Sequence, residues 1–109
     1  MHRKFIESKS FRRDWCALGL GDIELRALED ILLTDPEAGS VIQHTGGARK
    51  IRVAFPNKGK SGSGRVIYID AVVKDTIYLI AVYAKNVQEN LNEQEKKIIR
   101  ELVKRLKGE

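Results

Sequence analysis

The sequence predicts an α+β domain in which an N-terminal α-hairpin precedes a three-stranded antiparallel meander and a C-terminal helix. Three observations predict this order. Apolar residues recur at helical spacing before residue 35, alternate with polar residues after residue 41, and return to helical spacing after residue 92. We expect the helices to gather on one side of the sheet. With 109 residues, the chain has the length of one domain, residues 1–109.

The N-terminal region contains a short candidate strand at residues 3–7 and then two candidate helices. Ser8 or Ser10 is a suitable N-cap for the first helix, and Asp22 for the second. The second helix is expected to end before Pro36, because the residue before a proline avoids helical dihedral angles. The apolar residues that form the two helical stripes are Phe11, Trp15 and Leu18, then Leu25, Leu28, Ile31 and Leu32.

The meander is predicted from three segments of period two, at residues 49–55, 65–71 and 76–85. In the first of these, Lys50 and Arg52 point to the face opposite to the apolar residues. Short polar connections between the segments favour antiparallel pairing of neighbours.

The C-terminal helix has the clearest start signal in the chain. Asn92 is a suitable N-cap, and Glu95 stands three residues later, as in a capping box. The apolar stripe that follows is formed by Ile98, Ile99, Leu102, Val103 and Leu106.

The charge distribution points to a polyanion as ligand. The chain carries no acidic side chain between Glu37 and Asp70, and six of its 20 lysines and arginines lie within residues 49–65. They are Arg49, Lys50, Arg52, Lys58, Lys60 and Arg65. The net charge is +5, so the remaining 14 basic and 15 acidic residues have a net charge of −1. A local field of one sign favours binding of RNA or DNA.

Pairing of neighbouring strands would bring these cations together. Lys50 and Arg52 lie on the first strand of the meander, Arg65 begins the second, and Tyr83 and Lys85 lie at the end of the third. We expect their side chains to surround one concavity on the sheet face that the helices leave open. The alternative is that the lysines and arginines simply face solvent.

Several other functions are disfavoured by the sequence. The glycine-rich segment at 56–64 lacks the first Walker A glycine, which Ala54 replaces, and a strand follows it; we interpret Gly62 and Gly64 as part of a mobile arm. His2 and His44 lack partner ligands at usable spacing, and we expect no metal or other cofactor. We interpret His44 as a surface loop residue, with a catalytic role as a titrating group near the basic segment as the alternative.

The cellular setting is indicated by features that the chain lacks. A single cysteine, Cys16, excludes an internal disulfide bond and is consistent with a reducing cytoplasm; we expect it in the core. We find no membrane-spanning run and no signal peptide, so we expect no membrane partner. The seven aromatic residues are too sparse for a base-stacking platform.

An ordered series of short motifs resembles the RelE/ParE toxin superfamily, and within it the HigB-like branch. The motifs are Gly46-Gly47-Ala48-Arg49-Lys50-Ile51-Arg52, Lys58-Gly59-Lys60-Ser61-Gly62, Gly64-Arg65-Val66-Ile67-Tyr68, Val82-Tyr83-Ala84-Lys85-Asn86 and Asn90-Leu91. The likeness also covers the N-terminal α-hairpin and the turn from Asp35-Pro36 to Gly39. It implies a twisted antiparallel sheet with the N-terminal helices on one side.

The resemblance implies a small cytoplasmic toxin of a bacterial type II toxin–antitoxin pair. Many such toxins enter the ribosomal A site and cut mRNA, so the implied partners are the ribosome, mRNA and a cognate antitoxin, which we expect to be of the helix-turn-helix type. The resemblance places catalytic roles on Lys50, Arg52, Arg65 and Lys85. It places RNA binding on Lys58 and Lys60, to which we add Arg49 and Tyr83.

One departure from RelE concerns the proton-transfer groups. RelE has a catalytic tyrosine in its C-terminal segment, whereas this chain has no tyrosine after Tyr83. The chemistry would be attack of the RNA 2′-hydroxyl on the adjacent phosphate, with Lys50 or Lys85 as candidate base. Three alternatives remain open: a ParE-like gyrase poison, a non-enzymatic nucleic-acid-binding module, and a degenerate, inactive toxin.

Overall fold

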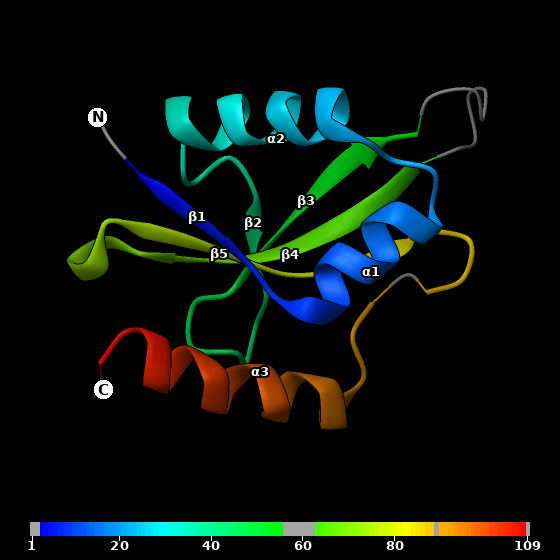
Figure 1. The fold of residues 1–109 in the computed structure, drawn as a ribbon. Helices are drawn as coiled ribbons and strands as arrows, with labels where there is room; N and C mark the ends of the chain where they lie inside the picture. The colour runs from blue at the N-terminus through cyan, green and yellow to red at the C-terminus, as the bar shows by residue number, and fades with distance from the viewer. Residues whose placement is uncertain (1–2, 56–62, 89, 109) are drawn as a thin grey trace.

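A five-stranded sheet lies between helix α2 on one side and helix α3 on the other (Figure 1). The computed structural model describes residues 3–55, 63–88 and 90–108. In chain order the elements are β1 (Lys4–Glu7), α1 (Lys9–Ala17), α2 (Asp22–Thr34), β2 (Ser40–Val41), β3 (Arg49–Ala54), β4 (Ser63–Ala71), a 3₁₀ turn (Val72–Lys74), β5 (Thr76–Ala84) and α3 (Glu93–Leu106). The predicted α+β class is confirmed.

The sheet is mixed, with strand order β1-β5-β4-β3-β2. Strands β2 to β5 pair in antiparallel fashion, which confirms the predicted meander. Strand β1 runs parallel to β5, with Lys4 opposite Thr76, so a wholly antiparallel sheet was the wrong expectation. Parallel pairing requires a long connection, and the chain from α1 to β4 supplies it. The two-residue strand β2 was not predicted, because two residues are too few to show a period.

The helix starts follow local hydrogen-bonding rules. The Ser8 hydroxyl oxygen accepts a hydrogen bond from the Phe11 amide at 3.0 Å and caps α1. At α3, Asn92 and Glu95 form the predicted capping box through bonds of 2.8 and 2.9 Å. The N-cap of α2 is Gly21 rather than the predicted Asp22. Asp22 is the first helical residue, where its negative charge interacts favourably with the positive end of the helix dipole.

The two faces of the sheet bury separate apolar clusters. Helices α1 and α2 cover one face, where Phe11, Trp15, Leu20, Leu28, Leu32, Phe55, Val66, Tyr68, Ile77, Leu79 and Val82 are buried together. The phenyl and indole rings of Phe11 and Trp15 stack with centroids 5.3 Å apart. This cluster confirms the predicted α1 stripe at Phe11 and Trp15.

Helix α3 packs on the opposite face. Its buried residues Ile99 and Val103 contact a cluster that includes Ile67 and Ile69 of β4. The expectation that all helices lie on one side of the sheet is therefore wrong. Strand β4 is buried on both faces, and its unbroken apolar run at 66–69 is typical of such a strand.

Helix α1 directs Cys16 away from the core. The Phe11 and Trp15 side chains define the buried stripe, and Cys16 stands one residue further, about 100° around the helix. Its side chain is exposed, contrary to the expectation that it belongs to the core. None of the helices in the described part of the chain combines the length and apolar character that a bilayer crossing requires.

Candidate functional site

A row of polar side chains crosses three neighbouring strands. Arg52 of β3 stands opposite Arg65 of β4, and Arg65 stands opposite Tyr83 of β5. Residues directly opposite one another place their side chains on the same face, with Cβ atoms about 5 Å apart. The strand pairing therefore brings together two arginine residues that are 13 positions apart in sequence.

Lys50 extends this row along β3. It lies two residues before Arg52, on the same face, opposite Ile67. Its Nζ atom donates a hydrogen bond of 3.0 Å to Oδ1 of Asn90, in the connection between β5 and α3. Asn90 was not singled out as a site residue from the sequence, although the Asn90-Leu91 pair stood among the motifs.

Lys85 directly follows β5. Its backbone amide donates a hydrogen bond of 3.1 Å to the carbonyl oxygen of Ser63, so the pairing with β4 continues past Ala84. This bond puts Lys85 two residues beyond Tyr83, at the end of the sheet where Arg65 lies. The Lys85 residue is exposed. The structure thus brings Lys50, Arg52, Arg65, Tyr83 and Lys85 into one region.

The four cations of this region form no ion pair with a carboxylate in the described part of the chain. They are Lys50, Arg52, Arg65 and Lys85. Arg65 donates a hydrogen bond to the neighbouring Gly64 carbonyl at 3.1 Å, and Arg52 is exposed. Like charges directly opposite each other on a sheet are destabilising, so an anion bound between them would relieve the repulsion.

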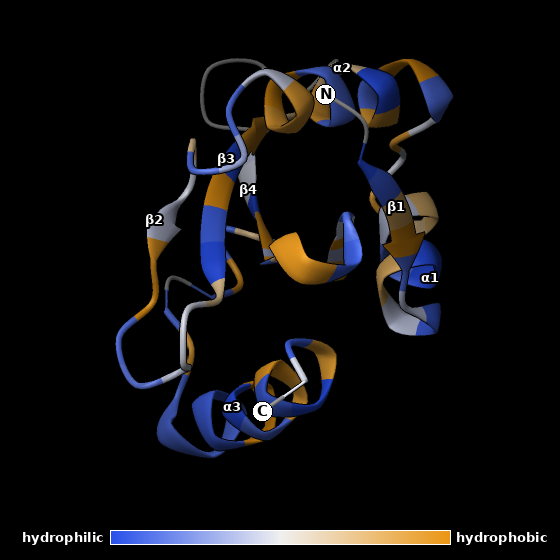
Figure 2. Ribbon diagram, turned by 90° about the vertical axis from the view of Figure 1, so that its left-hand side faces the viewer, coloured by the Kyte–Doolittle hydropathy of each residue, from blue (hydrophilic) through white to orange (hydrophobic). Residues whose placement is uncertain are grey.

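From the sequence we expected no helix on this face of the sheet, and that expectation is wrong. Ile67, opposite Lys50, and Ala81 and Tyr83 of β5 pack in the same cluster as α3. Figure 2 shows α3 turning hydrophobic residues toward the sheet and hydrophilic ones outward. Helix α3 therefore covers the apolar part of the face and lies beside the cationic part.

Arg49 lies on the other face of the sheet. It stands opposite Tyr68, and its guanidinium donates hydrogen bonds to the carbonyl oxygens of Gly39 at 2.7 Å and Glu37 at 3.3 Å. It also pairs with the Glu37 carboxylate at 3.6 Å. The structure does not bring Arg49 to the cationic row, and its contacts hold the chain between α2 and β2.

Tyr68 supports the same turn. Its hydroxyl donates to the Pro36 carbonyl at 2.7 Å and accepts from the Gly39 amide at 2.9 Å. Burial raises the pKa of the Tyr68 hydroxyl above its ordinary value, and the hydrogen bond from Gly39 and the charge of Arg49 partly oppose this rise. Gly39 is required here, because a Cβ atom would lie 2.6 Å from the Lys50 carbonyl oxygen.

Gly64 fixes the strand that carries Arg65. It is buried within β4, and a Cβ atom on it would lie 2.5 Å from the Phe55 ring and 2.6 Å from the Tyr83 carbonyl oxygen. The interpretation of Gly64 as part of a mobile arm is therefore wrong. Gly62, Lys58 and Lys60 lie outside the described residues.

The remaining predicted candidates lie elsewhere. His44 is an exposed loop residue with a φ of 68°, and its backbone carbonyl accepts a hydrogen bond from Arg100 of α3. Among the residues that the structure describes, no three histidine, cysteine, aspartate or glutamate side chains gather as a metal site would require.

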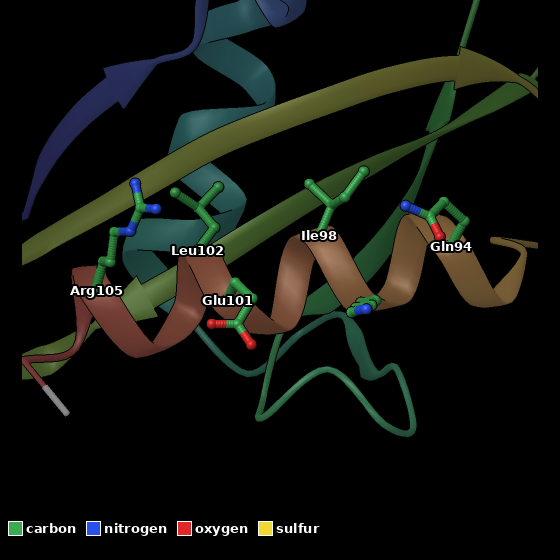
Figure 3. Close-up of a pocket in the computed structure, with 6 residues that line it drawn as sticks. Gln94, Ile98, Glu101, Leu102 and Arg105 are labelled. Atoms are coloured by element: carbon green, nitrogen blue, oxygen red, sulfur yellow. The ribbon is translucent and has the colours of Figure 1, made fainter.

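A separate hollow runs along α3 (Figure 3). Ile98 and Leu102 point toward the sheet side of the helix, and Glu101 points away from it. Charges of both signs line this hollow, at Lys97, Glu101 and Arg105. Its mixed charges distinguish it from the cationic row, so it is a poorer site for a polyanion.

Comparison with known proteins agrees with this fold. The family described as the RelE toxin of the RelE/RelB toxin–antitoxin system matches residues 7–108. A solved structure of an E. coli RelE toxin mutant in the free state is similar, with a TM-score of 0.57 and 18% sequence identity. The similarity covers 82% of this chain and 90% of that one. The match of the family to nearly the whole sequence shows that this chain belongs to the RelE toxin family of toxin–antitoxin systems.

Proposed function

We propose that this toxin is a ribosome-dependent mRNA endoribonuclease that acts as one domain in the cytoplasm. The observation that carries the proposal is the direct cross-strand pairing of Arg52 with Arg65, on a face where Lys50 also lies. Two arginines whose Cβ atoms lie about 5 Å apart can turn both guanidinium groups toward one phosphate and bind several of its oxygens. The motif series also supports placement in the HigB-like branch.

The proposed reaction uses the RNA's own 2′-hydroxyl as nucleophile. Its oxygen bonds to the adjacent phosphorus, the bond from phosphorus to the 5′ oxygen breaks, and a cyclic phosphate and a 5′-hydroxyl result. A base takes the 2′ proton, and an acid supplies a proton to the leaving oxygen. Arg52 and Arg65 stabilise the phosphorane charge, since their guanidinium groups stay protonated and present paired donors. Preorganised donors of this kind contribute about 3–4 kcal/mol each.

The lysines are proposed to have supporting roles. Lys50 and Lys85 are the candidates for proton transfer, because they border the arginine pair on β3 and after β5. Tyr83 completes the row beside Arg65 and contacts the RNA in this proposal. Pairing of the codon on the ribosome would supply most of the substrate positioning.

The RelE toxin family implies an antitoxin partner. We propose that this antitoxin is of the helix-turn-helix type and that the other partners are the ribosome and its bound mRNA. The antitoxin would have to hide either the cationic row or the surface that meets the ribosome.

The proposal is tested by expressing wild-type toxin, Arg52→Ala and Arg65→Ala in cells and mapping new mRNA 5′ ends. We expect cuts within translated codons for wild type, and loss of cuts and of growth inhibition for both variants. Arg26→Ala is the matched control, because Arg26 is exposed on α2, on the other side of the sheet. Growth inhibition by both variants at the wild-type level would eliminate the assignment, and toxicity with DNA damage but intact mRNA would indicate a gyrase poison.

A further inference from the structure

A polar hollow of about 310 Å³ lies next to Lys50, between β2, β3 and the start of α3. Two lysines from distant parts of the chain line it: Lys50 from β3 and Lys96 from the first turns of α3. The carboxamide side chains of Gln43 and Asn90 also line it. No carboxylate lines this hollow in the described part of the chain.

We propose that this hollow binds a backbone phosphate of the RNA next to the one that is cut. The inference rests on the proposed function, since it takes RNA as the ligand. Lys50 belongs both to the hollow and to the face that carries Arg52 and Arg65, so the two sites are continuous. An extended RNA strand passing the arginine pair would reach the hollow through Lys50.

Asn90 keeps the Lys50 charge available. Its amide oxygen accepts the 3.0 Å hydrogen bond from Lys50 Nζ and orients the ammonium group. A carboxylate in the same place would orient the group equally well, but it would cancel the charge that attracts the phosphate. An uncharged amide at residue 90 is therefore consistent with an anion-binding site.

Lys96 is also available to an anion. It lines the hollow, and its side chain is 20% exposed. Its ion-pair partner, Glu93, stands 3.8 Å away and is 86% exposed. Because the Glu93 carboxylate is solvent-exposed, salt screens its attraction to Lys96, so a phosphate can compete for the ammonium group.

The test measures binding of a short 2′-O-methyl oligouridine, which lacks the attacking hydroxyl group, at a series of salt concentrations. For single strands, the slope of log affinity against log salt is negative, and each lost phosphate contact decreases its magnitude by about 0.7. We expect this decrease for Lys96→Gln and no change for Lys97→Gln, because Lys97 lies outside the hollow on the same helix.

A second matched pair tests the amide. Asn90→Asp is expected to weaken binding severalfold, whereas Gln94→Glu adds the same charge to an exposed position of α3 and should leave binding near the wild-type value. Equal slopes for the two lysine variants, equal affinities for Asn90→Asp and Gln94→Glu, or failure of the wild-type protein to bind the probe would each overturn the proposal. The probe cannot be cut, so failure of the endoribonuclease assignment would leave this result standing.

Discussion

The two faces of the sheet are built from alternate residues of the same strands, yet they differ in what they carry. On β3, Ile51 and Val53 pack toward α1 and α2, whereas Lys50 and Arg52 point to the other face. The first face is closed by two helices, and the second is covered by α3 only over its apolar part. The comparison indicates that one face mainly stabilises the fold, while the other exposes cations at some cost in stability.

The largest expected effect on stability comes from opening the closed face. Phe11 is fully buried at the centre of that face, so Phe11→Ala should lower the free energy of unfolding by about 3–5 kcal/mol. The measurement is denaturant unfolding followed by circular dichroism. Ile23→Ala on α2 is the control, because Ile23 is 82% exposed and its loss should cost less than about 0.5 kcal/mol. Similar losses for both variants would contradict the assignment of this face.

A substitution at Gly64 should disturb the closed face and the strand that carries Arg65. Gly64→Ala places a methyl group against the Phe55 ring and the Tyr83 carbonyl oxygen, and we expect a loss of about 3 kcal/mol in the free energy of unfolding together with reduced mRNA cleavage. Adding Phe55→Leu removes the ring and should recover part of the stability. If the double variant is no more stable than Gly64→Ala, the ring contact is not the cause.

A smaller effect is expected from the Tyr68 hydroxyl on the closed face. Tyr68→Phe leaves the Gly39 amide and Pro36 carbonyl without their partner, so it should cost about 1–3 kcal/mol at neutral pH. The pKa of the Tyr68 hydroxyl is raised in the folded protein. The contribution of this hydroxyl to the free energy of unfolding is therefore fully present below the pKa of about 10 that it has in the unfolded chain, and it is lost as the pH rises through the folded pKa. From pH 8 upward, the free energy of unfolding should therefore fall more steeply with pH for wild type than for Tyr68→Phe. Parallel pH dependences for the two proteins would refute this.

The smallest effect is expected at the start of α3. Asn92→Ala removes the cap on the Glu95 amide and should cost about 1 kcal/mol, whereas Gln94→Ala at an exposed position should cost less. Thermal unfolding of the two variants makes the comparison. Equal melting temperatures would show that the capping box does not contribute to the stability of the second face.

Much of the fold could be predicted from the sequence because its signals are local. The capping box at Asn92 and Glu95, the α1 stripe and the alternation in β3 depend on residues within one or two turns of each other. The position of α3 on the opposite face of the sheet was not predicted, because the apolar run at 66–69 was interpreted only as a strand. Such a run is typical of a strand that is buried on both faces. Strand β1 was found, but its parallel pairing depends on the whole chain order.

The site was partly predictable for the same reason. The alternation of β3 put Lys50 and Arg52 on one face, and the strand pairing then placed Arg65 opposite Arg52. Arg49 was misplaced because adjacent residues of a strand point to opposite faces, which charge counting ignores. The proximity of Asn90 and Lys96 to Lys50 depends on how the connection between β5 and α3 returns to the sheet, and no local sequence pattern predicts that path.

The most direct test of the central claim is the single-turnover rate of cleavage of ribosome-bound mRNA by wild type, Arg52→Ala, Arg65→Ala and the double variant. If the two arginines bind the same phosphate, each single variant should be slower by about 100-fold or more, and the double variant should be little slower than the worse single one. Cleavage at the wild-type rate by either single variant would contradict the account.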